Sequence, residues 1–126
     1  LAHFKRGYYE MIPRGRKAEA QQEMARAEQA FIRAIEIDRD FIEAHRNLAR
    51  LYYLQQKYDQ AAIEYSHVLR LDPGDIDTYV QMAVVETELG NFEEAVNHIE
   101  AAKNETDDEQ IIQKLDNYIE KIKKAQ

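Results

Sequence analysis

An all-α fold is predicted by two features of the sequence, its composition and its hydrophobic spacing. Only four Gly and two Pro interrupt the 126 residues, and the intervals between them are rich in Ala, Glu, Gln, Leu, Ile and Lys, as in helical proteins. Between the turn signals at 13–15, 72–75, 90–91 and 104–108, apolar residues recur at i, i+3, i+4 and i+7. That spacing places them on one face of each helix, so we expect helices packed against helices.

The first clear helix ends near residue 40. Ala27, Phe31 and Ala34 share one helical face, and the segment 37–40 closes the helix. The apolar stripe continues backwards through residues 16–26, which predicts a helix of roughly 20 residues in this part of the chain.

The next two predicted helices form an antiparallel pair. Each carries one apolar face over about three to four turns. The turn 55–58 that joins them is short, so the two helices must run in opposite directions. The two apolar stripes consist of Ala44, Leu48, Leu51 and Tyr52, and of Ala61, Ala62, Tyr65, Val68 and Leu69.

This helix pair recurs at a period of 34 residues, because segment 42–75 aligns with segment 76–109. Self-similarity at such a period is the signature of a repeat architecture. Small residues at some matched positions allow close helix approach, and large residues at others fill the space between pairs. The matched positions are His45 with Tyr79, Leu48 with Met82, Ala49 with Ala83, Tyr58 with Phe92, Ala61 with Ala95, Tyr65 with Ile99, and Val68 with Ala102.

The last predicted helix covers residues 109–125. Asp107 or Asp108 precedes it as a candidate N-cap, and its Lys residues lie off the apolar face. Such a helix would cover the exposed face of the last repeat. Its apolar face consists of Ile111, Ile112, Leu115, Tyr118, Ile119 and Ile122.

Segment 42–75 resembles the tetratricopeptide repeat family. The residues that match its 34-residue pattern are Leu48, Ala49, Tyr52, Ala61, Tyr65 and Pro73, with departures at His45 and Val68. Segment 76–109 retains Tyr79, Ala83, Ala95 and Ala102, has Gly90 at the end of its first helix, and departs at Glu86 and Asp107. The resemblance implies a right-handed α–α superhelix of about three helix hairpins plus a C-terminal capping helix.

The same resemblance implies one domain over residues 1–126, with repeats at about 1–41, 42–75 and 76–109 and the capping helix at 109–125. Residues 3–9 resemble the first helix of the first repeat, with Gly7 in the small position. Gly7 and Ala27 are 20 residues apart, against 12 between the matching residues of the later repeats. We therefore expect about eight extra residues, which extend the second helix of this repeat.

The resemblance also implies a binding groove on the concave surface of the superhelix, lined mainly by the first helix of each repeat. The groove residues carried over from the family pattern are Phe4, Tyr8, Met11, Ile12, Glu43, Arg46, Arg50, Tyr53, Leu54, Asp77, Val80, Val84, Thr87 and Glu88. An apolar, aromatic end and two Arg suit a peptide with apolar anchors and a carboxylate. In the alternative interpretation, Arg46 and Arg50 are solvated and pair with Glu43 or Asp77.

Charge and composition restrict the partners. Seventeen basic and 24 acidic side chains give a net charge of −7, which repels phosphate backbones and anionic lipid headgroups. We therefore expect a protein or peptide partner and no nucleic acid. The apolar runs are far shorter than the roughly 20 residues that span a bilayer, so no direct membrane insertion is expected in this segment. The chain begins at Leu1 without Met, as expected of a piece of a longer protein, and cytoplasmic and bacterial-envelope locations both remain open.

No pattern indicates an enzyme, a cofactor or a metal. The sequence has no Cys, and it has no glycine-rich phosphate loop and no nucleophile motif. His98 follows Glu94 by four residues, a spacing that charged helices also produce by accident. The carboxylate clamp of chaperone-binding family members is not supported, because Tyr8, Asp77 and Gln81 replace clamp residues and only Asn47 matches.

Two functions remain. The first is a scaffold or adaptor that binds a partner's peptide segment in its groove, as an assembly factor or co-chaperone. The second is a structural module of a larger protein that forms a homodimer through its long helix or its C-terminal helix.

Overall fold

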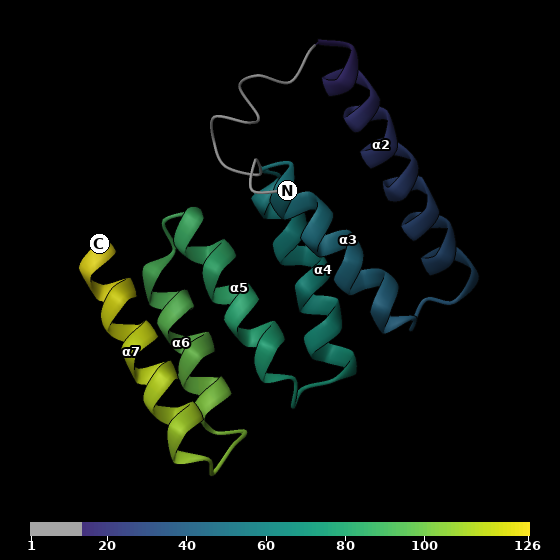
Figure 1. Ribbon diagram of the computed structural model, residues 1–126. Helices are drawn as coiled ribbons and strands as arrows, with labels where there is room; N and C mark the ends of the chain where they lie inside the picture. The colour runs from purple at the N-terminus through teal and green to yellow at the C-terminus, as the bar shows by residue number, and fades with distance from the viewer. Residues whose placement is uncertain (1–13) are drawn as a thin grey trace.

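The computed structural model describes residues 14–126, and this part of the chain forms six α-helices (Figure 1). They are α2 (Arg14–Ile37), α3 (Ile42–Leu54), α4 (Tyr58–Leu71), α5 (Ile76–Glu88), α6 (Phe92–Lys103) and α7 (Glu109–Ala125). Each helix packs against the next one along the chain. Figure 1 shows α4 between α3 and α5, and α6 between α5 and α7. The prediction of an all-α fold is confirmed.

Helix α2 is the longest of the six, with 24 residues against the roughly 20 expected from its apolar stripe. Phe31, Ile32 and Ile35 on one of its faces pack against the core. Ile37, its last residue, is 81% exposed. The expected first helix of the first repeat, at residues 3–9, lies outside the described residues.

The core consists of two apolar clusters that share α5. Small residues sit where helices meet most closely, since Ala49, Ala61, Ala83 and Ala95 are all fully buried. The first cluster joins α3, α4 and α5 through Leu48, Ala49, Tyr52, Ala61, Tyr65, Met82 and Val85. The second joins α5, α6 and α7 through Ala83, Ala95, Ile99, Ala102, Leu115, Ile119 and Ile122.

The turns within the two helix pairs have the same backbone geometry. Gln56 (φ 61°) and Gly90 (φ 80°) stand at equivalent positions, and both adopt the left-handed conformation. In each turn the N–H of the following residue donates to the carbonyl five residues earlier, at 2.8 Å. This is a helix-ending motif whose left-handed residue costs Gly nothing but strains the backbone of Gln.

Asp residues begin two of the helices. The side chain of Asp75 caps α5. The side chain of Asp108 caps α7 and accepts hydrogen bonds from the N–H groups of Gln110 at 2.9 Å and Ile111 at 3.4 Å. Of the two N-caps proposed for the last helix, it is therefore Asp108 that serves.

Candidate functional site

The first helices of successive pairs, α3 and α5, and helix α7 contribute to one surface, which we call the inner face. We define it by the half-buried residues Tyr53 on α3, Val80 and Val84 on α5, and Tyr118 on α7. Side chains from all three helices lie close enough there to affect one another electrostatically. Burial raises the pKa of Tyr118 on α7, and Tyr53 on α3 and Glu88 on α5 raise it further. Such electrostatic effects require the three groups to be near one another. The ring of Tyr53 also lies 5.6 Å from that of Tyr58, centroid to centroid.

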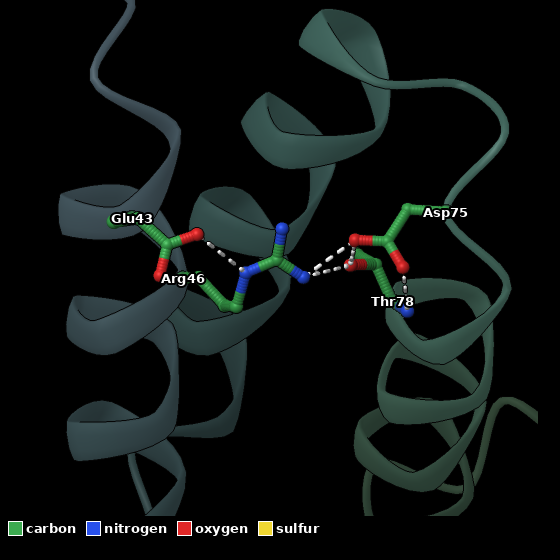
Figure 2. A network of polar contacts seen from close by, with 4 residues as sticks. All are labelled: Glu43, Arg46, Asp75 and Thr78. Carbon is green, nitrogen blue, oxygen red and sulfur yellow. Dashed lines mark hydrogen bonds and ion pairs between the residues drawn. The ribbon is translucent and has the colours of Figure 1, made fainter.

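Arg46 ties α3 to the start of α5 across the inner face (Figure 2). Its Nη1 donates to Asp75 Oδ2 and, at 3.2 Å, to Thr78 Oγ1. Thr78 Oγ1 donates in turn to Asp75 Oδ2 at 2.7 Å. On the other side, Arg46 Nε lies 3.7 Å from Glu43 Oε1. One guanidinium is thus shared between two carboxylates and a hydroxyl group.

The pKa values of this network show that its ionised form is favoured. Burial raises the pKa of Asp75, but hydrogen bonds from Arg46 and Thr78 outweigh it, and the pKa lies below its usual range. Burial lowers the pKa of Arg46, but the hydrogen bond to Asp75 and the nearby carboxylates together raise it by more, so the pKa is raised. An incoming carboxylate would have to compete with Asp75 for this guanidinium.

In the alternative interpretation, the two Arg residues pair with Glu43 or Asp77. The contacts of Arg46 differ from that interpretation in one partner. Glu43 is a partner as expected, whereas Asp75 takes the place proposed for Asp77. Asp75 is the N-cap of α5 and its carboxylate is fixed at the helix end. Arg50, one turn further along α3, is exposed. Burial raises the pKa of Tyr65, and the charge of Arg50 offsets only part of this rise.

The other predicted groove residues divide into three groups. Tyr53, Val80, Val84 and Thr87 are half-buried on α3 and α5. Within this group, the hydroxyl group of Thr87 donates to the carbonyl of Ala83 at 2.8 Å, so it is already engaged. Leu54 is 64% exposed, and Asp77 and Glu88 are also exposed. Phe4, Tyr8, Met11 and Ile12 lie outside the described residues.

A hollow of about 670 Å³ opens between α5 and α7. We call it the α5–α7 hollow. It is lined by Asp72, Gly74, Asp75, Ile76, Asp77, Val80, Ile111, Lys114, Leu115 and Tyr118. Only Asp77 and Val80 of these residues were expected from the groove pattern. The α7 residues were missed because that helix was interpreted as a cap.

A signal for the missed residues was present in the sequence. Continuing the 34-residue period beyond residue 109 would make α7 the first helix of a further unit. The groove positions of Asp77, Val80 and Val84 would then recur at Ile111, Lys114 and Tyr118, all three of which line the hollow.

One part-buried histidine–carboxylate contact joins the two helices of each pair. His45 Nδ1 lies 2.7 Å from Glu64 Oε1, and its Nε2 lies 2.8 Å from the carbonyl oxygen of Arg39. In the next pair His98 Nδ1 contacts Glu86 Oε1. The hydrogen bond that His98 donates to Glu86 raises the pKa of His98 and outweighs the opposing effect of burial. Glu86, at a position where the family usually has Tyr, is thus accommodated in the interior by a partner on α6.

Neither a metal site nor a membrane span is found in residues 14–126. No three His, Asp or Glu side chains in this part of the chain come together as metal ligands would. None of its helices is both long and apolar enough to cross a bilayer.

Comparisons with known proteins agree with this repeat geometry. Residues 42–75 match the family model described as tetratricopeptide repeat. No curated protein matches the sequence. Solved structures do match, among them the Yersinia enterocolitica type III secretion translocator chaperone SycD. It has 16% sequence identity and a TM-score of 0.72, over 85% of this chain and 77% of that one.

Two further structures show the same likeness. One is the TPR2B domain of yeast Sti1, with 14% identity and a TM-score of 0.72 over 89% of this chain and 92% of that one. The other is the first TPR of Spaghetti (RPAP3), with 19% identity and a TM-score of 0.70 over 88% and 86%. The fold is therefore that of an α-helical repeat protein. The resemblance to the tetratricopeptide repeat family is confirmed, by the matched repeat and by the superhelical structures that share its fold.

Proposed function

We propose that this chain is a protein–protein interaction scaffold that holds a segment of a partner protein against its inner face, as an adaptor in assembly or as a co-chaperone. The observation that carries the proposal is the set of half-buried side chains on three helices, Tyr53 on α3, Val80 and Val84 on α5 and Tyr118 on α7, of which Val80 and Tyr118 line one hollow. Aromatic side chains give a large contact area at low entropic cost, which is typical of binding surfaces.

Several proteins with the same fold support the proposal through what was solved with them. SycD was solved with a peptide of the translocator YopD. PcrH was solved with the chaperone-binding region of PopD, and the RPAP3 domain with the HSP90 peptide SRMEEVD. A role without catalysis is in keeping with these chaperones and adaptors.

The structure changes which charge on the partner we expect. Two Arg suggested a carboxylate-bearing peptide, but Arg46 is held by Asp75, Thr78 and Glu43. Of these two arginines, Arg50 alone would then remain for a carboxylate on the partner. We infer that apolar contacts, and not a pair of arginines, contribute most of the affinity.

A selection of displayed random peptides on the purified chain tests the proposal. The affinity of the selected peptides is then measured for a Tyr53→Ala, Val84→Ala double variant and for Ile63→Ala, which removes a 56% exposed side chain from α4. We expect at least a tenfold loss for the first variant, since truncated anchors commonly cost more than about 1.4 kcal/mol, and no change for the second. Equal affinities for the three proteins, with helicity preserved, would contradict the proposal.

The homodimer remains a second hypothesis, favoured by the exposure of Ile37 at the end of α2. Light scattering over a concentration series decides it. A mass that rises to twice the monomer value supports the homodimer, and a monomer at all concentrations removes it.

A further inference from the structure

We propose that the α5–α7 hollow receives an apolar side chain of the partner segment that lies next to a lysine or arginine, and that Asp72 and Asp77 attract this cation. This inference rests on the proposed function, because it assigns a class of residue to one end of the inner face.

The floor of the hollow is apolar and partly open. Ile76 and Val80 from α5 and Ile111 and Tyr118 from α7 are half-buried and line it, so part of each side chain remains in contact with solvent. Leu115, which is 5% exposed, closes the base. Removing such surface from water is favourable by about 25 cal/mol per Å². The volume of about 670 Å³ is ample for a large side chain and its neighbours.

The rim of the hollow is acidic. Asp72 and Asp77 line it and are exposed. Glu105 lies next to it, because its Oε1 would be 3.4 Å from a Cβ atom on Gly74. Asp75 also lines the hollow, but its charge is balanced by Arg46.

Lys114 is the one basic residue among the lining residues in the described part of the chain. The carboxylates at the rim therefore outnumber the nearby cations, in a chain whose net charge is −7. A cationic side chain on the partner complements this potential, and a carboxylate is repelled by it.

The test uses the displayed peptides selected on the wild-type chain. We expect Lys or Arg to be enriched beside an apolar residue in the selected sequences. An Asp72→Asn, Asp77→Asn double variant should bind them about three- to tenfold more weakly at 50 mM salt, with a smaller loss at 500 mM. Lys114→Ala should bind them more tightly, because it removes the competing cation.

A matched control separates the local potential from net charge. Asp59→Asn with Glu93→Gln changes the net charge of the chain by the same amount, at exposed positions on α4 and α6. We expect this variant to bind as the wild type does. An equal loss in both double variants, or no loss in either, overturns the inference. A second arm, Val80→Trp, fills the hollow without changing charge and should weaken binding by tenfold or more.

The failure of this inference is distinguishable from failure of the proposed function. Selected peptides that lose affinity with Tyr53→Ala, Val84→Ala but show neither basic enrichment nor sensitivity to Asp72, Asp77 and Val80 contradict the hollow alone. Peptides that are insensitive to all of these variants contradict both.

Discussion

At the scale of single residues, Glu86 shows how a departure from the family pattern is tolerated. It replaces the usual Tyr, and its side chain is 10% exposed. A carboxylate in such a place is costly unless it is hydrogen-bonded. His98 on α6 supplies the partner, and the Nδ1 of the same ring also lies 3.1 Å from the carbonyl oxygen of Glu94. Glu86 is thus paired with a side chain of the neighbouring helix.

This pair predicts a pH dependence of stability. Glu86 raises the pKa of His98 in the folded chain above the unfolded value of about 6.5. The contribution of the pair is therefore fully present below about pH 6.5 and is lost as the pH rises through the folded pKa. The groups facing the ring are Glu86 from α5, Glu94 on its own helix, and the ring of Tyr79 at 6.2 Å.

Urea unfolding of the wild type and His98→Gln at pH 5.5 and pH 8.5 measures this dependence. We expect the variant to be less stable at pH 5.5, by about 1 to 3 kcal/mol for a buried carboxylate that loses its partner, and the difference between the two proteins to shrink at pH 8.5. Glu86→Gln should remove the same pH-dependent part. A difference that is equal at both pH values would show that the pair does not contribute in its charged form.

The same scale shows where the sequence stops being informative about the site. Arg46 was placed at the inner face by its position in the repeat. Its partners were not, because Asp75 lies 29 residues away and its orientation is set by capping α5. The repeat pattern gives the position of a side chain on a helix. It does not give the contacts that a neighbouring helix offers.

At the scale of elements, the turn after each first helix requires one residue at positive φ. Gly90 meets this requirement freely, and Gln56 meets it at the cost of a side chain in the left-handed region. A Cβ atom on Gly90 would meet nothing within 4 Å. Backbone strain is therefore the only penalty for a side chain at this position. The two repeats have the same turn with and without that penalty, so they can be compared directly.

Reciprocal substitutions test this account. Gly90→Ala should lower the free energy of unfolding by about 1 kcal/mol, and Gln56→Gly should raise it by about 0.5 kcal/mol, because relief of strain exceeds the added entropy of the unfolded chain. Gly15→Ala, in helix α2 and also without a neighbour within 4 Å, serves as the control and should not destabilise. The free energy of unfolding is measured by chemical denaturation. Changes of the same sign for Gly90→Ala and Gln56→Gly would contradict the account.

The elements themselves were largely predictable from the sequence. Apolar spacing and turn residues located the helix pair at 42–71 and its repeat at 76–103, because periodicity is a property of each segment alone. The role of α7 was only partly predictable. Its apolar face indicated a cap, and it does bury Leu115, Ile119 and Ile122 in the second cluster. Its other side lines the α5–α7 hollow, which is apparent only when the helix is placed beside α5.

At the scale of the whole molecule, the order of packing produces the inner face. Each helix contacts its sequence neighbours, so the first helices alternate with the second ones (Figure 1). In such stacks stability is a sum of neighbouring interfaces, which leaves one continuous surface free to vary. On this surface the chain has aromatic residues on α3 and α7, an Arg46 on α3 that is paired with Asp75 at the start of α5, and an acidic hollow between α5 and α7.

The central claim is that this inner face holds the partner segment. The most direct measurement is NMR spectroscopy of the ¹⁵N-labelled chain with the tightest selected peptide carrying a nitroxide spin label. The account predicts paramagnetic broadening of residues on α3, α5 and α7, including Tyr53, Val84 and Tyr118, with Ile63 on α4 and Glu93 on α6 unaffected. Broadening centred on the exposed sides of α4 and α6 would contradict it.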